Sequence, residues 1–123
     1  MSKAVYDIHG VRILECAADG PKVRGPGDAT DLIGLAWEQK AGLVMLPTER
    51  LGEDFLVLTT GLAGEVIQKF VNDGVGLAIV GDISLAVARS QPLHDFVYES
   101  NRGRHVWFVA DMNELVAKLA AGR

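Results

Sequence analysis

Residues 58–82, LTTGLAGEVIQKFVNDGVGLAIVGD, contain the two patterns that decide the expected fold. The first half has apolar residues at the three- and four-residue spacing of one helix face: Leu62, Val66, Ile67 and Phe70. A helix is therefore expected from Thr60 to residues 72–74, where Asn-Asp-Gly is typical of a helix end. The second half, residues 75–81, is continuously apolar, as is a strand covered on both faces. A helix followed by such a strand predicts a parallel α/β sheet.

Upstream of this stretch, the sequence predicts a β-hairpin, a loop and a helix. Apolar and polar residues alternate on both sides of His9-Gly10, as in two strands joined by a tight turn. Residues 18–28 are rich in glycine and proline and are expected to form a loop. Asp28 or Thr30 is expected to cap a helix that runs to about Lys40.

Two shorter segments connect this helix to the deciding stretch. Residues 43–46 predict a buried strand, which ends at Pro47 because proline cannot donate a hydrogen bond to a sheet ladder. After a polar loop, the apolar residues 55–58 are expected to return the chain to the core.

Downstream, the pattern predicts helix, strand and helix. Pro92 suits the first turn of a helix that ends near residues 101–103. The inner face of that helix is expected to carry Leu93, Phe96 and Val97. Residues 105–110 predict a strand, and Asp111 with Glu114 three residues later predicts a capping box at the start of the last helix.

The expected fold is therefore α/β, with a mixed, mainly parallel sheet, an N-terminal β-hairpin and about four helices. Residues 1–123 are expected to form a single domain, since the chain has ordinary globular composition and no linker or internal repeat. Residues 75–80 are expected to be a central strand of the sheet.

Composition narrows the expected partners and compartment. Lys and Arg number 12 against 16 Asp and Glu, and this net charge of -4 argues against binding to nucleic acid or to a membrane surface. The single cysteine, Cys16, excludes an internal disulfide, and no stretch is of signal-peptide or membrane-spanning type. We expect a cytoplasmic protein. Its oligomeric state stays open, homo-oligomers included.

The expected fold brings one group of polar residues together. Ligands of open α/β sheets tend to bind beyond the carboxyl ends of the strands, where helix N-termini present unpaired N–H groups. The residues expected at that rim are Pro47, Thr48, Thr59, Thr60, Asp82, Ser84 and Asp111. Thr59, Thr60, Asp82 and Ser84 are the candidates for partner binding or phosphorylation. Thr48, Glu99 and Asn101 are further candidates for ligand contact.

The two threonines have two interpretations, which are compatible. A threonine hydroxyl before a helix satisfies an unpaired N–H, and its loss costs about 1 kcal/mol. A phosphorylated threonine would instead place negative charge at a helix N-terminus, where the helix dipole favours it.

Catalytic and metal-binding patterns are not found in the sequence. The three histidines form neither HxH nor HExxH, and no second carboxylate lies at ligand spacing from Asp82. The glycines form neither GxGxxG nor GxxxxGK[ST]. Cys16, on a hairpin strand, is expected to be a small buried apolar residue. We therefore expect no catalytic residues, metal or cofactor.

Two long phrases resemble a bacterial family of unknown function. DFLVLTTGLAGEVIQKFVNDGVGLAIVGD (residues 54–82) and HDFVYESNRGRHVWFV (residues 94–109) are similar to family phrases such as DFFDLSTGLAGEILQKF, LAIVGD and FIYESNKG. The family is domain of unknown function 4180, and the resemblance covers nearly all of the chain from Gly10 onward. It implies no assigned activity. At residues 57–59 the family often has an acidic residue and a serine instead.

A more distant resemblance is to STAS domains, the anti-sigma factor antagonist fold. Thr59-Thr60-Gly61-Leu62 resembles the Ser-Ser-Gly-Leu turn of those domains, at the same place in the same order of elements. In STAS domains a partner kinase phosphorylates the first serine, so the resemblance implies that role for Thr59. The aspartate that precedes the serines in STAS domains is Leu58 here.

Two hypotheses for function follow. The first is a small STAS-like regulatory or interaction domain that presents the rim around Thr59, Thr60 and Asp82 to a protein partner. The second is a small enzyme or ligand-binding protein with a pocket beneath the same rim, in which Asp82, Glu99 or Cys16 would be polar members. A deep pocket with converging polar groups would favour the second hypothesis.

Overall fold

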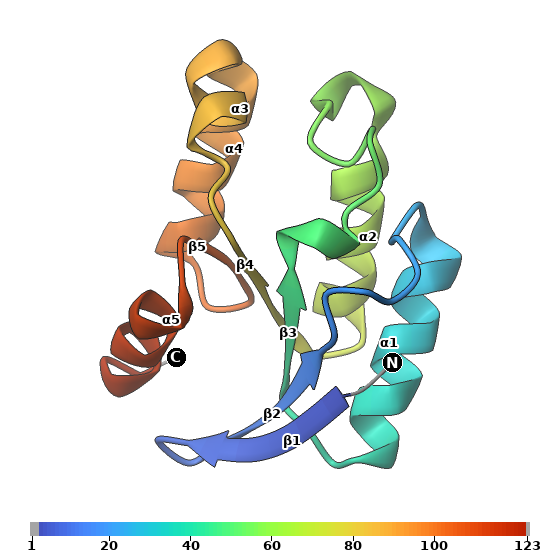
Figure 1. Cartoon of the computed structure of the whole chain (residues 1–123), viewed down its shortest axis with the longest axis vertical. Helices are drawn as coiled ribbons and strands as arrows, with labels where there is room; N and C mark the ends of the chain where they lie inside the picture. Colours follow the sequence, from blue (N-terminus) through green and yellow to red (C-terminus); the bar gives the residue numbers. More distant parts are fainter. Residues whose placement is uncertain (1–2, 123) are drawn as a thin grey trace.

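The computed structural model describes residues 3–122 of the 123-residue chain (Figure 1). The strands are β1 (Lys3–Ile8), β2 (Val11–Cys16), β3 (Leu43–Pro47), β4 (Gly76–Val80) and β5 (Val106–Val109). The α-helices are α1 (Pro26–Glu38), α2 (Leu62–Asn72), α3 (Ser84–Arg89), α4 (Gln91–Arg102) and α5 (Met112–Ala120). Two 3-10 turns, Thr48–Arg50 and Leu58–Thr60, lie between β3 and α2.

The five strands form one mixed sheet in the order β1-β2-β3-β4-β5. β1 pairs antiparallel with β2 through the tight turn at His9-Gly10, and the other three pairings are parallel. The predicted fold class is confirmed: an α/β fold with a mainly parallel sheet and an N-terminal hairpin. β4 lies between β3 and β5 and is buried at all five positions, as the continuous apolar run predicted.

Helices cover the two faces of the sheet unequally, because consecutive parallel strands are neighbours and right-handed crossovers place their helices on one side. α1, α2 and α4 pack on the face formed by Val44, Leu46, Leu77, Ile79 and Phe108. α5 packs on the opposite face with Leu115 and Leu119 against Trp107 and its neighbours. Figure 1 shows α1 and α2 side by side, with α5 on the other side of the sheet.

The inner face of α2 is close to the predicted one. Phe70 is fully buried and Val66 nearly so, while Ile67 packs partly buried against the same core. Ala63 takes the buried position in the first turn, and Leu62 remains partly exposed. The helix therefore presents a slightly rotated version of the expected stripe to the sheet.

The start of α1 and one exposed position in the segment before α2 differ from the expected structure. α1 begins at Pro26 with Gly25 at its N-cap, so the prediction of an Asp28 or Thr30 cap is wrong. The reason is that Pro26 already has the φ angle of a first helical turn, and the carboxylate of Asp28 instead accepts the backbone N–H of Arg24 at 2.8 Å. Farther along, residues 55–58 return to the core as expected through fully buried Phe55 and partly buried Leu56 and Leu58, whereas Val57 is 47% exposed.

The described residues contain five α-helices rather than about four, and the additional one is α3. It ends at Arg89. The extended backbone of Ser90 then separates it from α4, and the Ser90 hydroxyl accepts the N–H of Leu93 at 3.2 Å. Pro92 lacks an N–H, so the hydrogen-bond ladder of α3 cannot continue unbroken into α4.

Candidate functional site

The carboxyl ends of β3 and β4 are adjacent, and just beyond them Thr48 and Gly81 are in close contact. Pro47 and Val80 are register partners, and each strand is followed at once by an irregular segment. Gly81 has φ +152°, and a Cβ added there would lie 2.2 Å from Oγ1 of Thr48. Glycine at this position therefore lets the chain leave β4 while the Thr48 side chain fills the adjacent space.

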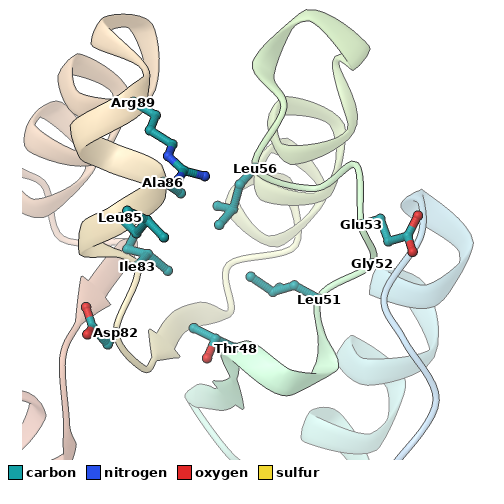
Figure 2. Close-up of a pocket in the computed structure, with 10 residues that line it drawn as sticks. All are labelled: Thr48, Leu51, Gly52, Glu53, Leu56, Asp82, Ile83, Leu85, Ala86 and Arg89. Carbon is teal, nitrogen blue, oxygen red and sulfur yellow. The ribbon is translucent and has the colours of Figure 1, made fainter.

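Beyond these strand ends lies a cavity of about 400 Å³ between the segment after β3 and helix α3 (Figure 2). Its lining comprises Thr48, Leu51, Gly52, Glu53, Leu56, Asp82, Ile83, Leu85, Ala86 and Arg89. Figure 2 shows Leu56 and Arg89 pointing toward one another from opposite walls, above Leu51 and Ile83. The cavity thus has mainly apolar walls with one cationic side chain, Arg89, and two carboxylates, Glu53 and Asp82.

A second cavity of about 440 Å³ adjoins the first and shares Glu53, Leu56 and Ala86 with it. Its other lining residues are Val57, Leu58, Thr59, Ser90, Pro92 and Leu93. We call the two cavities together the strand-end groove. Two of its large apolar residues are exposed, Val57 at 47% on one wall and Leu85 at 63% on the other.

Asp82 and Ser84 stabilise the start of α3. Oδ1 of Asp82 accepts the backbone N–H of Ser84 at 2.9 Å. Hydrogen bonds from the Ser84 hydroxyl and from this N–H lower the pKa of Asp82, because they favour its charged form. Asp82 lines the groove, whereas Ser84 does not.

Thr59 and Thr60 have different surroundings in the structure. The Thr60 hydroxyl accepts the N–H of Leu62, the first residue of α2, at 3.3 Å, but the N-cap position is taken by Gly61 with φ +78°, so α2 begins two residues later than expected. The same hydroxyl donates to the carbonyl of Val57 at 2.8 Å. Thr59 is exposed and lines the second cavity, and no described residue forms a hydrogen bond with its side chain. Thr60 therefore supports the fold, whereas the exposed side chain of Thr59 takes no part in the hydrogen bonds of the described residues.

Glu99 and Asn101 lie away from the groove. Glu99 is exposed on α4 and pairs with Arg102 at 3.4 Å. Asn101 holds the outer edge of β5: its Oδ1 accepts the N–H of Phe108 at 2.7 Å, and its Nδ2 donates to the carbonyl of Phe108 at 3.1 Å. The structure thus gives Asn101 a structural role at the sheet edge.

Asp111 likewise has a structural role at the start of α5. Its Oδ1 accepts the N–H of Glu114 at 3.0 Å, which is the first half of the predicted capping box. The Glu114 carboxylate reaches back to the N–H of Ala110 at 3.1 Å, one residue before the expected position.

Two features of the groove were not predicted from the sequence: the wall formed by α3, and Arg50, which supports the opposite wall. Leu85, Ala86 and Arg89 lie on α3, whose only signal was Asp82 two residues before a run of good helix formers. Arg50 is 7% exposed and its guanidinium donates to the carbonyls of Ala17 and Pro21, which anchors the loop before α1 to the segment after β3. Nothing in the local sequence predicts those partners.

Features of other classes of site are not found in the described part of the chain. No group of three or more His, Cys, Asp or Glu residues there could hold a metal ion. Residues 3–122 also contain no helix that is both long and apolar enough to cross a membrane.

Comparison with known proteins gives one match. The model of a family described as "Domain of unknown function" matches residues 8–119, which is almost the whole chain and includes the entire groove. No curated protein and no solved structure matches the chain.

Proposed function

We propose that this chain, which belongs to the domain of unknown function 4180 (DUF4180) family, is a non-catalytic binding domain that holds an apolar segment of a partner protein in the strand-end groove. The observation that carries the proposal is the joining of two cavities along Leu56 and Ala86. The two cavities share lining residues on both walls, Leu56 on one and Ala86 on the other, so together they offer a larger surface than either cavity alone. Such a surface suits a stretch of chain better than a compact ligand.

Exposed apolar side chains support a protein partner. Val57 and Leu85 are 47% and 63% exposed on opposite walls of the groove. A partner segment that covers both would remove apolar surface from water at about 25 cal/mol per Å². Few large apolar residues of the described chain are this exposed, and two of them flank one groove.

Charge in the groove specifies part of the partner's chemistry. Arg89 lies on the groove wall, and no carboxylate of residues 3–122 is within 4.0 Å of its guanidinium. An acidic residue beside the apolar segment of the partner would pair with this cation. The paired carboxylate would fix the direction in which the segment lies.

Thr59 gives the proposal a regulatory component of the STAS type. Its exposed hydroxyl lies at the second cavity, so a phosphate there would add about -1.5 to -2 charges to the lip of the groove. We propose that this charge changes the affinity for the partner. Because the domain has a single, buried cysteine, we further propose that it acts in the reducing cytoplasm.

The proposal is tested by recovering partners from host lysate with tagged protein and identifying them by mass spectrometry. Leu85→Glu places a charge in the groove, and Val116→Glu places the same charge on α5, whose other residues pack on the opposite face of the sheet. We expect the Leu85 variant to lose its partner at least tenfold and the Val116 variant to retain it. Equal recovery by both variants would contradict the proposal.

The Thr59 series tests the regulatory component separately. Thr59→Asp should change partner recovery while Thr59→Ala leaves it near the wild-type level, with both proteins melting at the wild-type temperature. Identical partner profiles across the series would remove the switch and leave the binding groove.

A small-ligand pocket is the second candidate function, and the volume of the first cavity favours it. About 400 Å³ lies within the usual range of ligand sites, and Thr48 and Arg89 supply a hydroxyl and a cation there. Native mass spectrometry of protein purified from its host distinguishes the two candidates, because a retained small molecule adds a discrete mass. Loss of that mass in Arg89→Ala, without loss of a protein partner, would favour the pocket.

A further inference from the structure

The two edge strands of the sheet, β5 and β1, differ in whether their outward-pointing backbone groups have hydrogen-bond partners. At the β5 edge, His105 and Val109 accept hydrogen bonds from β4, so alternation points the N–H and C=O of Phe108 away from the sheet. The side-chain amide of Asn101 binds both of these groups and takes the place of a further strand. The β5 edge is therefore closed at its centre.

Within residues 3–122, no side chain covers the β1 edge in this way. Gly42 donates to the carbonyl of Arg12, so the backbone groups of Arg12 point toward β3 and those of Val11 and Ile13 point toward β1. Ala4, Tyr6 and Ile8 use their N–H and C=O groups within the hairpin, and Lys3, Val5 and Asp7 direct theirs outward. No described residue forms a hydrogen bond with the backbone of Val5 or Asp7.

β1 also lacks two of the devices that usually prevent pairing at an edge, proline and a β-bulge, although it carries a third, charged residues, at positions 3 and 7. It contains no proline, and its register with β2 runs through six consecutive pairs without a bulge. Figure 1 shows β1 at the margin of the sheet, with its outer side away from the other strands.

We propose that β1 pairs antiparallel with β1 of a second copy of this chain, about a two-fold axis at Val5. In this register Val5 lies opposite Val5, and residue 3 of each copy lies opposite residue 7 of the other. All outward-pointing residues then meet in hydrogen-bonded pairs, and each pair exchanges two bonds, which makes about six in total. The two sheets join into one continuous sheet.

The charge pattern of the strand favours a second copy as the occupant. Residue 3 is a lysine and residue 7 an aspartate, so the proposed register places opposite charges across the interface twice. Asp7 is 65% exposed, and Arg12 at 3.9 Å is its ion-pair partner among the described residues. A shift by two residues would place Asp7 opposite Val5 and move Lys3 to the turn at His9, where φ is +49°.

Sedimentation of the full chain with a C-terminal tag measures the association, because β1 then remains free. At about 100 µM, a concentration suited to a small interface, we expect twice the mass of one tagged chain. Val5→Pro removes one outward N–H that the hairpin does not use, and it should weaken the dimer at least tenfold. Val5→Thr, the matched control, keeps the N–H and the β-branched shape and should remain dimeric.

Asp7→Lys is the second variant, and it tests the proposed β1–β1 dimer even if Val5→Pro does not fold. It changes an exposed side chain and places like charges opposite one another at both ends of the interface. We expect a dimer at least several-fold weaker, partly restored by added salt. If wild type had the mass of a single tagged chain at every concentration, the proposal would be overturned, as it would by an unchanged dimer in Asp7→Lys or in a folded Val5→Pro.

Discussion

The side chain of Thr48 occupies the space in which a side chain at Gly81 would begin, so that an added Cβ would lie 2.2 Å from Thr48 Oγ1 and 2.6 Å from its Cγ2. This contact joins the ends of β3 and β4 at the base of the strand-end groove. Gly81→Ala should therefore lower the free energy of unfolding by about 1–3 kcal/mol, through both the backbone strain at φ +152° and the steric contact.

Urea unfolding of a double-mutant cycle separates these two causes. Thr48→Gly removes the three atoms nearest the new methyl group, so the pair Thr48→Gly/Gly81→Ala should recover the steric part only. Strict additivity of the two single changes would show that the contact does not contribute.

Phe70→Ala tests the packing of α2. Phe70 is fully buried against the sheet, so we expect a loss of roughly 3–5 kcal/mol and a much lower melting temperature. Gln68→Ala, on the exposed face of the same helix, is the control and should change stability by less than about 0.5 kcal/mol. Equal melting temperatures for the two variants would show that the buried face is assigned wrongly.

Arg50→Met tests the anchoring of the loop before α1. The substitution keeps an unbranched side chain but removes the donors to the carbonyls of Ala17 and Pro21. Because hydrogen bonds from charged groups are worth about 1.5–3 kcal/mol each and two are lost, the variant should be about 3–6 kcal/mol less stable by chemical unfolding. Hydrogen exchange should rise in residues 17–23 first; uniform protection there would contradict the role.

Thr60 and Thr59 should differ in their effect on stability. Thr60→Ala removes the acceptor for the N–H of Leu62 and should cost about 1 kcal/mol, whereas Thr60→Ser keeps the hydroxyl and should be nearly neutral. Thr59→Ala removes a side chain with no hydrogen-bond partner in residues 3–122, so its melting curve should match that of wild type. A larger loss in Thr59→Ala than in Thr60→Ala would reverse the assignment.

The lowered pKa of Asp82 predicts that the stability of the fold depends slightly on pH in the acidic range. Its pKa is lowered from the ordinary 3.8 by the hydrogen bonds of Ser84. A lowered pKa means that the folded state holds the proton less tightly, so this contribution is complete above pH 3.8 and is lost as the pH falls through the lower value. Asp82→Asn should remove that dependence, seen as a smaller change in melting temperature between pH 5 and pH 2, about the range over which carboxylates titrate.

Sequence alone determined the elements whose signals are local. The alternation around His9-Gly10, the stripe ending at Phe70, the continuous apolar run of β4 and the first half of the Asp111 cap all act within a few residues. Apolar spacing selects helix or strand, and the alternation of those elements selects the sheet, because each must bury its apolar face against the next. The order of elements could therefore be predicted without coordinates.

The groove could be predicted only in part, because only some of its residues lie in elements with a clear local signal. Strand ends placed Thr48 and Asp82 at one rim, since parallel neighbours end on the same side, and Thr59 followed from the element order. The α3 wall was missed because a six-residue helix carries too few turns to show a period. Boundaries at Gly25 and Gly61 were missed because glycine takes cap positions by its backbone freedom, which leaves no side-chain signal.

Tertiary structure alone decided the contacts between residues far apart in the chain. Arg50 binds carbonyls 29 and 33 residues away, and Thr48 meets Gly81 only because β3 and β4 are neighbours in register. Asn101, which seemed from its place in the sequence to be free for a ligand, is committed to the backbone of Phe108 at the sheet edge. Such partners are set by the packing of the whole sheet, because a buried or edge polar group must bind whichever group the fold brings within reach.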